Sequence, residues 1–147
     1  MAIEDIKIIT SLNSISSWDE TIESSLQERL LEEVGREEGF ETYSVYAVLD
    51  LDLVHPIMVG GVIFAFQETT IWIDALWVAP MFRKKGLGFQ LLNHIESVAK
   101  KWGCRTIQLN TYLNDAHYFF LACGFEDVAI IPNWKYGLEC YLMRRKG

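Results

Sequence analysis

Basic residues are scarce in this sequence. Lys and Arg together number 13 against 20 Asp and Glu, which gives a formal net charge of −7 over 147 residues. A protein that binds nucleic acid through a broad basic face needs many clustered cations to neutralise phosphates. The composition therefore argues against a nucleic-acid partner, and leaves room only for local groups of cations.

Cysteines are few, and long apolar runs are missing. Cys104, Cys123 and Cys140 are an odd number without the spacing of a metal site, so we expect reduced, mostly buried thiols, no metal and a cytoplasmic protein. No window approaches the ~18 consecutive apolar residues of a membrane span. Residues 1–17 lack a basic start followed by a long apolar run, so we expect neither a signal peptide nor a membrane partner.

Apolar residues are abundant overall, at 50% of the chain, and 13% of the residues are aromatic. This composition makes disorder unlikely over most of the length, and the length suits one substantial core. No repeat, linker or low-complexity segment divides the sequence. We expect a single domain over residues 1–147.

Hydrophobic periodicity predicts an α+β domain with a mixed central sheet. The predicted strands cover residues 6–10, 43–51, 57–67, 70–78, 106–111, 126–131 and 139–144, and the strands within 43–78 form an antiparallel meander. Helices are predicted over 18–34, from the glycine turn at residue 86 to residue 102, and over 115–123, each followed by a glycine. Residues 132–134 form a predicted loop.

Several polar and glycine residues have predicted local roles. Ser17 and Glu20 form a capping box for the first helix, and Asn114 caps the last one. Gly60 and Gly61 lie inside a predicted strand and indicate a bulge or a close backbone approach. Acidic residues dominate between residues 19 and 52, which indicates either a solvated face or a wall that attracts a cationic substrate.

One stretch, Ala75 to Leu92, combines a strand, a tight turn and a helix start. Three cations and two glycines mark the turn: Arg83, Lys84, Lys85, Gly86 and Gly88. A helix start leaves backbone N–H groups unpaired with a partial positive charge, and glycines let an anion approach them. The turn predicts a bound phosphate group.

Other interpretations of the turn compete with this one. A Walker loop would need Gly-Lys-Ser or Gly-Lys-Thr, and a dinucleotide fingerprint would need a small residue where Leu91 stands. A nucleotide-binding protein using the same turn is a further alternative, as is a plain helix start with solvated cations.

The pattern Val78-x-Pro80-x-x-Arg83-x-x-Gly86-x-Gly88, followed downstream by Asn114-x-Ala116, Phe119-Phe120 and Gly124-Phe125, resembles the GNAT superfamily of acyl-CoA N-acyltransferases. The resemblance is strongest over residues 71–125. It implies a GNAT-like, mostly antiparallel sheet flanked by helices, with a splayed strand pair at the cofactor site.

The resemblance implies acetyl-CoA as the cosubstrate. The pyrophosphate would lie on the backbone from Lys84 to Phe89, and the pantetheine arm would pair with the strand end around Leu76 to Val78. The full set of implied cofactor-binding residues is Leu76, Trp77, Val78, Arg83, Lys84, Lys85, Gly86, Leu87, Gly88, Phe89, Asn114, Phe119 and Phe120.

Acetyl transfer to an amine needs a proton acceptor, an oxyanion donor and a proton for the departing thiolate. The resemblance implies the backbone N–H of Val78 as the oxyanion donor. Asp74 is the candidate base because it interrupts an apolar strand, where a buried charge would need a reason. Strand alternation predicts Trp72, Asp74 and Leu76 on one face. Pairing with a structural donor, or exposure to solvent, is the alternative for Asp74.

The proton donor departs from the family pattern, since Phe120 stands where many members have a tyrosine. Tyr118 lies about 200° around a helix from that position and cannot replace it. Tyr112, Cys123 or a water are the remaining candidates. His117 could contact substrate or be structural. Four aromatic residues could line an acceptor pocket or belong to the core: Trp77, Tyr112, Tyr118 and Trp134.

These observations predict an acetyl-CoA-dependent N-acetyltransferase that acts on a primary amine of a small molecule or peptide. The acceptor molecule can be cationic. The alternative is a non-catalytic acyl-CoA-binding or regulatory module with the same fold, which Phe120 favours and Asp74 disfavours. The resemblance also implies a possible homodimer.

Overall fold

The computed structural model describes residues 5–13, 15–35, 41–49 and 55–146 of the chain. They belong to two compact units, Met1–Gly39 and Phe40–Gly147. Within these residues no helix is long and apolar enough to cross a membrane. The single domain over residues 1–147 stays a prediction.

The described residues of the first unit include the α-helix α1 (Ser16–Val34). It ends as predicted at Gly35, whose φ of 78° is left-handed and whose N–H donates to the Leu31 carbonyl. The predicted capping box is wrong, because Ile15 holds the N-cap position and no side chain bonds there. Ser17 lies inside the helix instead, where its carbonyl accepts a 2.9 Å hydrogen bond from Thr21 Oγ1.

The strand predicted over residues 6–10 is wrong. These residues form no regular structure and are exposed, with Ile8 at 97%. A strand needs a neighbour to pair its N–H and C=O groups, and no described residue pairs with this segment. The apolar side chains Trp18, Ile22 and Leu26 of α1 are exposed as well.

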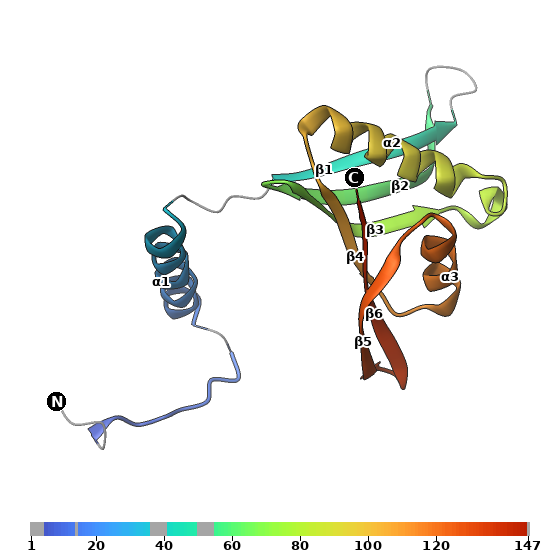
Figure 1. The fold of residues 1–147 in the computed structure, drawn as a ribbon. Helices are drawn as coiled ribbons and strands as arrows, with labels where there is room; N and C mark the ends of the chain where they lie inside the picture. The colour runs from blue at the N-terminus through green and yellow to red at the C-terminus, as the bar shows by residue number, and fades with distance from the viewer. Residues whose placement is uncertain (1–4, 14, 36–40, 50–54, 147) are drawn as a thin grey trace. The chain divides into compact units, whose positions relative to one another are not determined.

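The second unit is built on a six-stranded sheet of order β1-β2-β3-β4-β6-β5 (Figure 1). The strands are β1 (Glu41–Leu49), β2 (Ile57–Gln67), β3 (Thr70–Val78), β4 (Thr106–Thr111), β5 (Glu126–Lys135) and β6 (Leu138–Lys146). Only β3 and β4 are parallel. The predicted mixed, mostly antiparallel sheet is confirmed, as is the meander of β1, β2 and β3.

The strand bounds agree with the sequence for β2, β3 and β4. Residues 50 and 51, predicted at the end of the second strand, lie outside the described residues. The loop predicted over 132–134 is wrong, because those residues belong to β5. The hairpin turns at Tyr136 and Gly137, both left-handed (φ 55° and 73°), while Asn133 (φ 52°) marks an irregular register within the strand.

Two helices accompany the sheet, α2 (Leu87–Trp102) and α3 (Asn114–Ala122), and a short 3-10 turn, η2 (Pro80–Phe82), precedes α2. Gly103 ends α2 as predicted, in the left-handed conformation. The predicted cap at Asn114 is wrong: Leu113 holds the N-cap position of α3, and no side chain bonds there.

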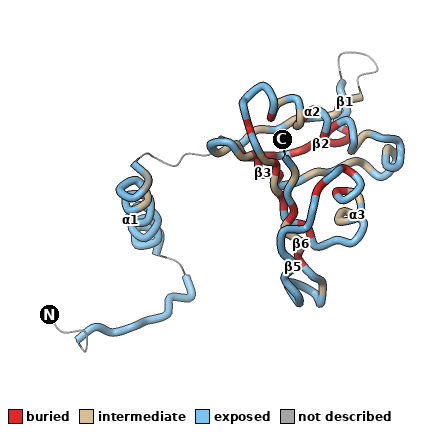
Figure 2. The backbone as a smooth tube through the Cα atoms, in the orientation of Figure 1, coloured by how far each residue is buried: buried red, intermediate tan, exposed pale blue. Residues whose placement is uncertain are grey.

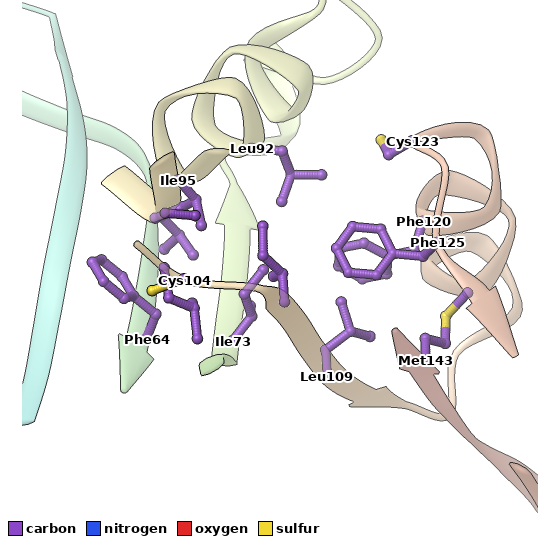
Figure 3. Close-up of a cluster of buried hydrophobic side chains, with 14 residues drawn as sticks. Phe64, Ile73, Leu92, Ile95, Cys104, Leu109, Phe120, Cys123, Phe125 and Met143 are labelled. Carbon is purple, nitrogen blue, oxygen red and sulfur yellow. The ribbon is translucent and has the colours of Figure 1, made fainter. Parts of the chain in front are cut away.

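The core lies between one face of the sheet and these two helices (Figure 3). Its fully buried members include Phe64, Ile71, Ile95, Leu109 and Met143. Both helices contribute to this one cluster, so both pack on the same face of the sheet. Within the strands, the buried residues belong to β2, β3, β4 and β6, and parts of α2 and α3 are buried too (Figure 2).

All three cysteines are free and buried, as predicted. Burial raises the pKa of Cys104. It also raises the pKa of Cys123, although the nearby Arg145 opposes the shift. Cys123 is only 9% exposed, so its thiol is a poor candidate for delivering a proton to a ligand.

Candidate active site

The parallel strands β3 and β4 separate part-way along their length. Their pairing ends at Ile73 and Leu109, while β3 continues to Val78 and β4 to Thr111. The sheet therefore has two arms beyond this point: the end of β3 with the turn that follows it, and the group formed by β4, β6 and β5 (Figure 1). A splayed pair of this kind is what the sequence resemblance implied.

Asp74 lies where the splay begins. The pairing of β3 with β2 passes from Ile73 directly to Ala75, so Asp74 is the extra residue of a bulge. The bulge reverses the alternation: Ile73 faces the core, and Leu76 also packs against it. The predicted common face for Trp72, Asp74 and Leu76 is therefore wrong, because a bulge shifts one strand by a residue.

Asp74 and Ala75 are both exposed. The cost of burying a charge, from which the sequence argument for Asp74 began, does not arise at this position. What distinguishes Asp74 is its place, since the bulge lies directly after Ile73, the last residue of β3 that pairs with β4.

The backbone direction at the end of β3 follows from the register with β2. Gly60 lies opposite Val78, and the next bond joins the Ala79 N–H to the Val59 carbonyl at 2.8 Å. Gly60 and Val78 therefore form a non-hydrogen-bonded pair, whose N–H and C=O groups point away from each other. The N–H of Val78 faces the splay, and so does that of Leu76, two residues earlier.

Arg83 fixes the turn that follows β3. Its Nε donates a 2.8 Å hydrogen bond to the Val78 carbonyl, which is the outward-facing carbonyl just described. The guanidinium therefore links the cation cluster to the strand end, while Lys84 and Lys85 remain exposed. Lys85 also lies over the Phe82 ring, with Nζ 5.8 Å from its centroid.

The turn itself presents a row of free backbone donors. No backbone carbonyl of the described residues accepts from the N–H groups of residues 84–89; the next N–H, that of Gln90, donates to the Gly86 carbonyl. Lys84 (φ 60°) and Gly86 (φ 85°) are both left-handed, and nothing lies within 4 Å of a methyl group placed on Gly86. Successive N–H groups in such a turn form an anion-binding concavity.

Gly60, Gly61 and Gly88 are small for packing reasons. A methyl group on Gly60 would lie 3.0 Å from the Trp77 carbonyl, and one on Gly61 2.9 Å from that of Val45, which confirms the predicted close approach. A methyl group on Gly88 would lie 2.9 Å from Cζ of Phe119. Gly88 therefore admits α3 against the helix start.

The remaining predicted residues lie at or near α3. Phe119 packs edge-on against Phe89, with ring centroids 5.3 Å apart. Phe120 is only 6% exposed and belongs to the core, so its ring has little surface left for a cofactor. Tyr112 directly follows β4 and is 39% exposed. Asn114, also exposed, begins the helix.

The four aromatic residues that could line an acceptor pocket or belong to the core all lie outside the core. Their exposed fractions are 45% for Trp77, 39% for Tyr112, 69% for Tyr118 and 46% for Trp134. The core alternative is therefore wrong for each of them.

A cluster on the second arm joins His117 of α3, Asp127 of β5 and Tyr141 of β6. The imidazole Nε2 lies 2.9 Å from both carboxylate oxygens of Asp127. The imidazole also stacks on the Tyr141 ring, with centroids 3.6 Å apart and planes inclined by 10°. We call these three residues the His117 cluster. Sequence reasoning gave no role to Asp127 or Tyr141, because no local pattern links residues from three separate elements.

Tyr141 is the member of the cluster whose strand pairs directly with β4. It pairs with Thr111, the last residue of β4. Burial raises the pKa of Tyr141, and the hydrogen bond with Glu139 and the charges of Glu139 and Asp127 raise it further. Its phenol therefore stays protonated and uncharged at neutral pH.

Comparison with known proteins identifies the family. The model of the acetyltransferase (GNAT) family matches residues 12–125, which span the end of β3, the glycine turn and α3. The chain belongs to the GNAT family of acetyltransferases. It is accordingly an N-acetyltransferase, and this family uses acetyl-CoA.

Individual GNAT relatives agree in sequence and in structure. Blasticidin-S acetyltransferase from Streptomyces morookaense is 29% identical over 104 residues, which cover 70% of this chain and 74% of the relative. An acetyltransferase structure from Bacillus cereus superimposes with a TM-score of 0.78 at 24% identity, over 96% of this chain and 98% of that one. A protein of Arabidopsis thaliana, solved in complex with the bisubstrate analogue CoA-Ac-MVNAL, gives a TM-score of 0.52 at 29% identity, over 60% and 66%.

The GNAT assignment suits the geometry of the first arm. The free N–H groups of residues 84–89, the open space beside Gly86 and the exposed cations fit a pyrophosphate. The outward-facing amides of Leu76 and Val78 fit a ligand with an amide backbone of its own, which can pair with them as a strand would.

Proposed function

We propose that this protein transfers the acetyl group of acetyl-CoA to a primary amine of a small molecule or a peptide. The observation that carries the proposal is the end of β3, where the Val78 N–H faces the splay and the glycine turn follows after η2. The end of β3 thus supplies an N–H donor for the thioester of the cofactor, and the turn that follows supplies an anion site for its pyrophosphate.

In this proposal, the cofactor's pyrophosphate binds the N–H groups of residues 84–89, with help from Arg83, Lys84 and Lys85. The pantetheine arm pairs with the backbone at Leu76 and Val78. This direction brings the thioester toward the start of the splay, where Asp74 lies.

The reaction proceeds by direct attack through a tetrahedral intermediate. Asp74 takes a proton from the ammonium form of the acceptor, directly or through a water, and the neutral amine attacks the thioester carbonyl carbon. The Val78 N–H donates to the oxyanion that forms. The intermediate's nitrogen loses its extra proton to solvent and the C–S bond breaks, which leaves the neutral amide; the thiolate takes a proton from solvent, or from Tyr112, which then regains one from solvent. A thiolate whose conjugate thiol has a pKa of ~8 to 9 leaves readily enough for a solvent proton to serve.

A small or peptide acceptor is supported by the relatives. One of them is named for blasticidin S, and another was solved with an analogue that joins CoA to a peptide. The excess of acidic residues in the chain supports a cationic acceptor, because a net charge of −7 attracts cations.

The proposal is tested with a panel of amines that contains blasticidin S, polyamines, aminoglycosides, amino acids and peptides. Acetyl-CoA should be consumed with release of free thiol for at least one of them. Tight CoA binding without turnover across the panel would instead support an acyl-CoA-binding module. Calorimetry with CoA and ATP addresses the cofactor, and tighter binding of ATP would contradict the proposal.

Asp74→Asn tests the proposed base. We expect kcat to fall about 100-fold, because general-base assistance is worth that much, while CoA binding is unchanged. Glu126→Gln is the matched control, since Glu126 is an exposed carboxylate at the start of β5. Equal activity of Asp74→Asn and Glu126→Gln would remove Asp74 from the mechanism.

A cytoplasmic location and a homodimer are also part of the proposal. Sedimentation of the purified protein at several concentrations checks the dimer.

A further inference from the structure

The second arm carries polar groups that the proposed transfer does not use. The His117 cluster lies on α3, β5 and β6, whereas the proposed cofactor contacts lie mainly on β3, the glycine turn and the start of α2. Such an arrangement of an imidazole, a carboxylate and a phenol needs an explanation, because packing alone would be served by apolar residues.

The tautomer of His117 follows from its partner. An ionised carboxylate only accepts hydrogen bonds, so Nε2, which lies 2.9 Å from both oxygens of Asp127, carries the hydrogen. In the neutral ring Nδ1 then has a free lone pair. The carboxylate and the stacked Tyr141 ring hold the imidazole in one orientation.

Nδ1 is also accessible. None of the described residues forms a hydrogen bond with it, and among these residues no buried side-chain nitrogen or oxygen is left unpaired. An unpaired nitrogen that is not buried reaches solvent. The His117 side chain as a whole is only 12% exposed, so this accessible atom belongs to a ring that is otherwise enclosed.

The surroundings of the cluster are negative. The carboxylates of Asp127 on β5 and Glu139 on β6 both act on the Tyr141 hydroxyl electrostatically. A fixed lone pair beside carboxylates and an aromatic face favours a cationic group with N–H donors.

The location connects the cluster with the candidate active site. α3 contacts both arms: Phe119 packs against Gly88 and Phe89 of the first, and His117 packs against Tyr141 and Asp127 of the second. Figure 1 shows α3 in the angle between them. One short helix thus joins the turn that would hold the cofactor to the His117 cluster.

We propose that His117 recognises the acceptor, with Nδ1 accepting a hydrogen bond from a second, cationic N–H group that is distinct from the amine being acetylated. This inference rests on the proposed transfer to an amine and narrows the acceptor to diamines, polyamines and related dications. His117 acts on acceptor affinity, and Asp74 on the chemical step.

The test uses the full chain with CoA bound and spermidine as the probe. The chain has three histidines, so the ring signals of His117 can be followed by NMR and assigned with His117→Phe. Spermidine should shift the His117 signals and leave those of His94 unchanged. n-Butylamine, a monoamine without a second cationic group, should shift neither. No shift of His117 with spermidine, or the same shift with n-butylamine, would overturn the inference.

Variants separate recognition from folding. His117→Phe keeps a ring for Tyr141 and removes the lone pair, so spermidine affinity should fall about tenfold or more, with CoA affinity unchanged. Asp127→Asn should weaken spermidine binding in the same direction. His94→Gln is the matched control, because His94 is exposed on α2. Unchanged spermidine affinity in both cluster variants would contradict the inference.

Turnover distinguishes the two proposals. If the wild-type protein acetylates spermidine and His117→Phe raises the KM for spermidine with kcat unchanged, both the proposed function and the recognition role of His117 stand. If wild type acetylates a monoamine equally well and His117→Phe has no effect, the proposed function stands and the recognition role fails. If spermidine shifts His117 but no amine is acetylated, the binding site stands and the proposed transfer fails.

Discussion

The glycine turn and the His117 cluster are two polar sites that meet the same helix and are built in opposite ways. The turn is made of backbone N–H groups from consecutive residues 84–89. The cluster is made of side chains from α3, β5 and β6. A backbone site leaves a local pattern of glycines and cations in the sequence, whereas a site assembled from distant side chains leaves none.

The largest predicted effect breaks the turn alone. Gly86 and Gly103 flank the two ends of α2, both are left-handed, and neither has an atom within 4 Å of an added methyl group. Replacing either by Ala should cost about 1 kcal/mol of unfolding free energy, because a left-handed alanine is strained. Only Gly86→Ala should also weaken CoA binding, by about tenfold, since its methyl occupies the space beside the free N–H groups.

Calorimetry with CoA and urea unfolding of both variants check this expectation. Spermidine binding, which belongs to the cluster, should be equal in the two variants. Equal loss of CoA affinity in Gly86→Ala and Gly103→Ala would mean that the loss reflects stability and that the turn is no anion site.

A smaller effect sharpens the link between the two sites. Gly88→Ala places a methyl group 2.9 Å from Phe119 Cζ, so the phenyl ring must move and the protein should lose about 1 kcal/mol of unfolding free energy. The same substitution in a Phe119→Leu background should cost less, because the atom in the way is gone. A double-mutant cycle by urea unfolding measures the difference. Additive losses would show that Gly88 and Phe119 do not constrain each other.

The smallest effect concerns the cluster alone. Burial, with Glu139 next, raises the pKa of Tyr141 above the ordinary value of 10.0, so the unfolded chain releases this proton first. The protonated Tyr141 hydroxyl contributes fully to the free energy of unfolding below about pH 10, and this contribution declines as the pH rises further. Tyr141→Phe should reduce that decline in urea unfolding. Burial raises the pKa of Cys104 and Cys123 too, so a residual decline is expected. An unchanged alkaline decline in the variant would contradict the assignment.

The sequence predicted the second unit well because its signals are local. Strand bounds for β2, β3 and β4 follow from runs of β-branched residues, and Gly35 and Gly103 end helices as their backbone freedom suggests. The segment of residues 6–10 has the same composition and forms no strand, since a strand exists only with a partner. Ser17 and Asn114 satisfy the composition of a cap but lie inside their helices.

The candidate site likewise has features that could be predicted from the sequence and features that could not. The turn itself could be predicted from the spacing of Arg83, Gly86 and Gly88, and its binding of a phosphate group stays a prediction. The bulge at Asp74 could not, because register depends on the pairing with β2. The packing of Phe119 on Gly88 was likewise hidden, since it depends on how α3 meets α2 in space.

The nine-residue helix α3 has a consequence for the affinities with which the two substrates would bind. Phe119 touches the start of α2, and His117, two positions earlier, touches β5 and β6. If α3 moves as one rigid helix, a ligand that displaces Phe119 also moves the imidazole. Linkage requires the effect to be mutual, and each substrate would change the affinity of the other by the same factor. Phe119, which belongs to neither proposed chemical step, would then determine whether cofactor and acceptor bind independently or change each other's affinity.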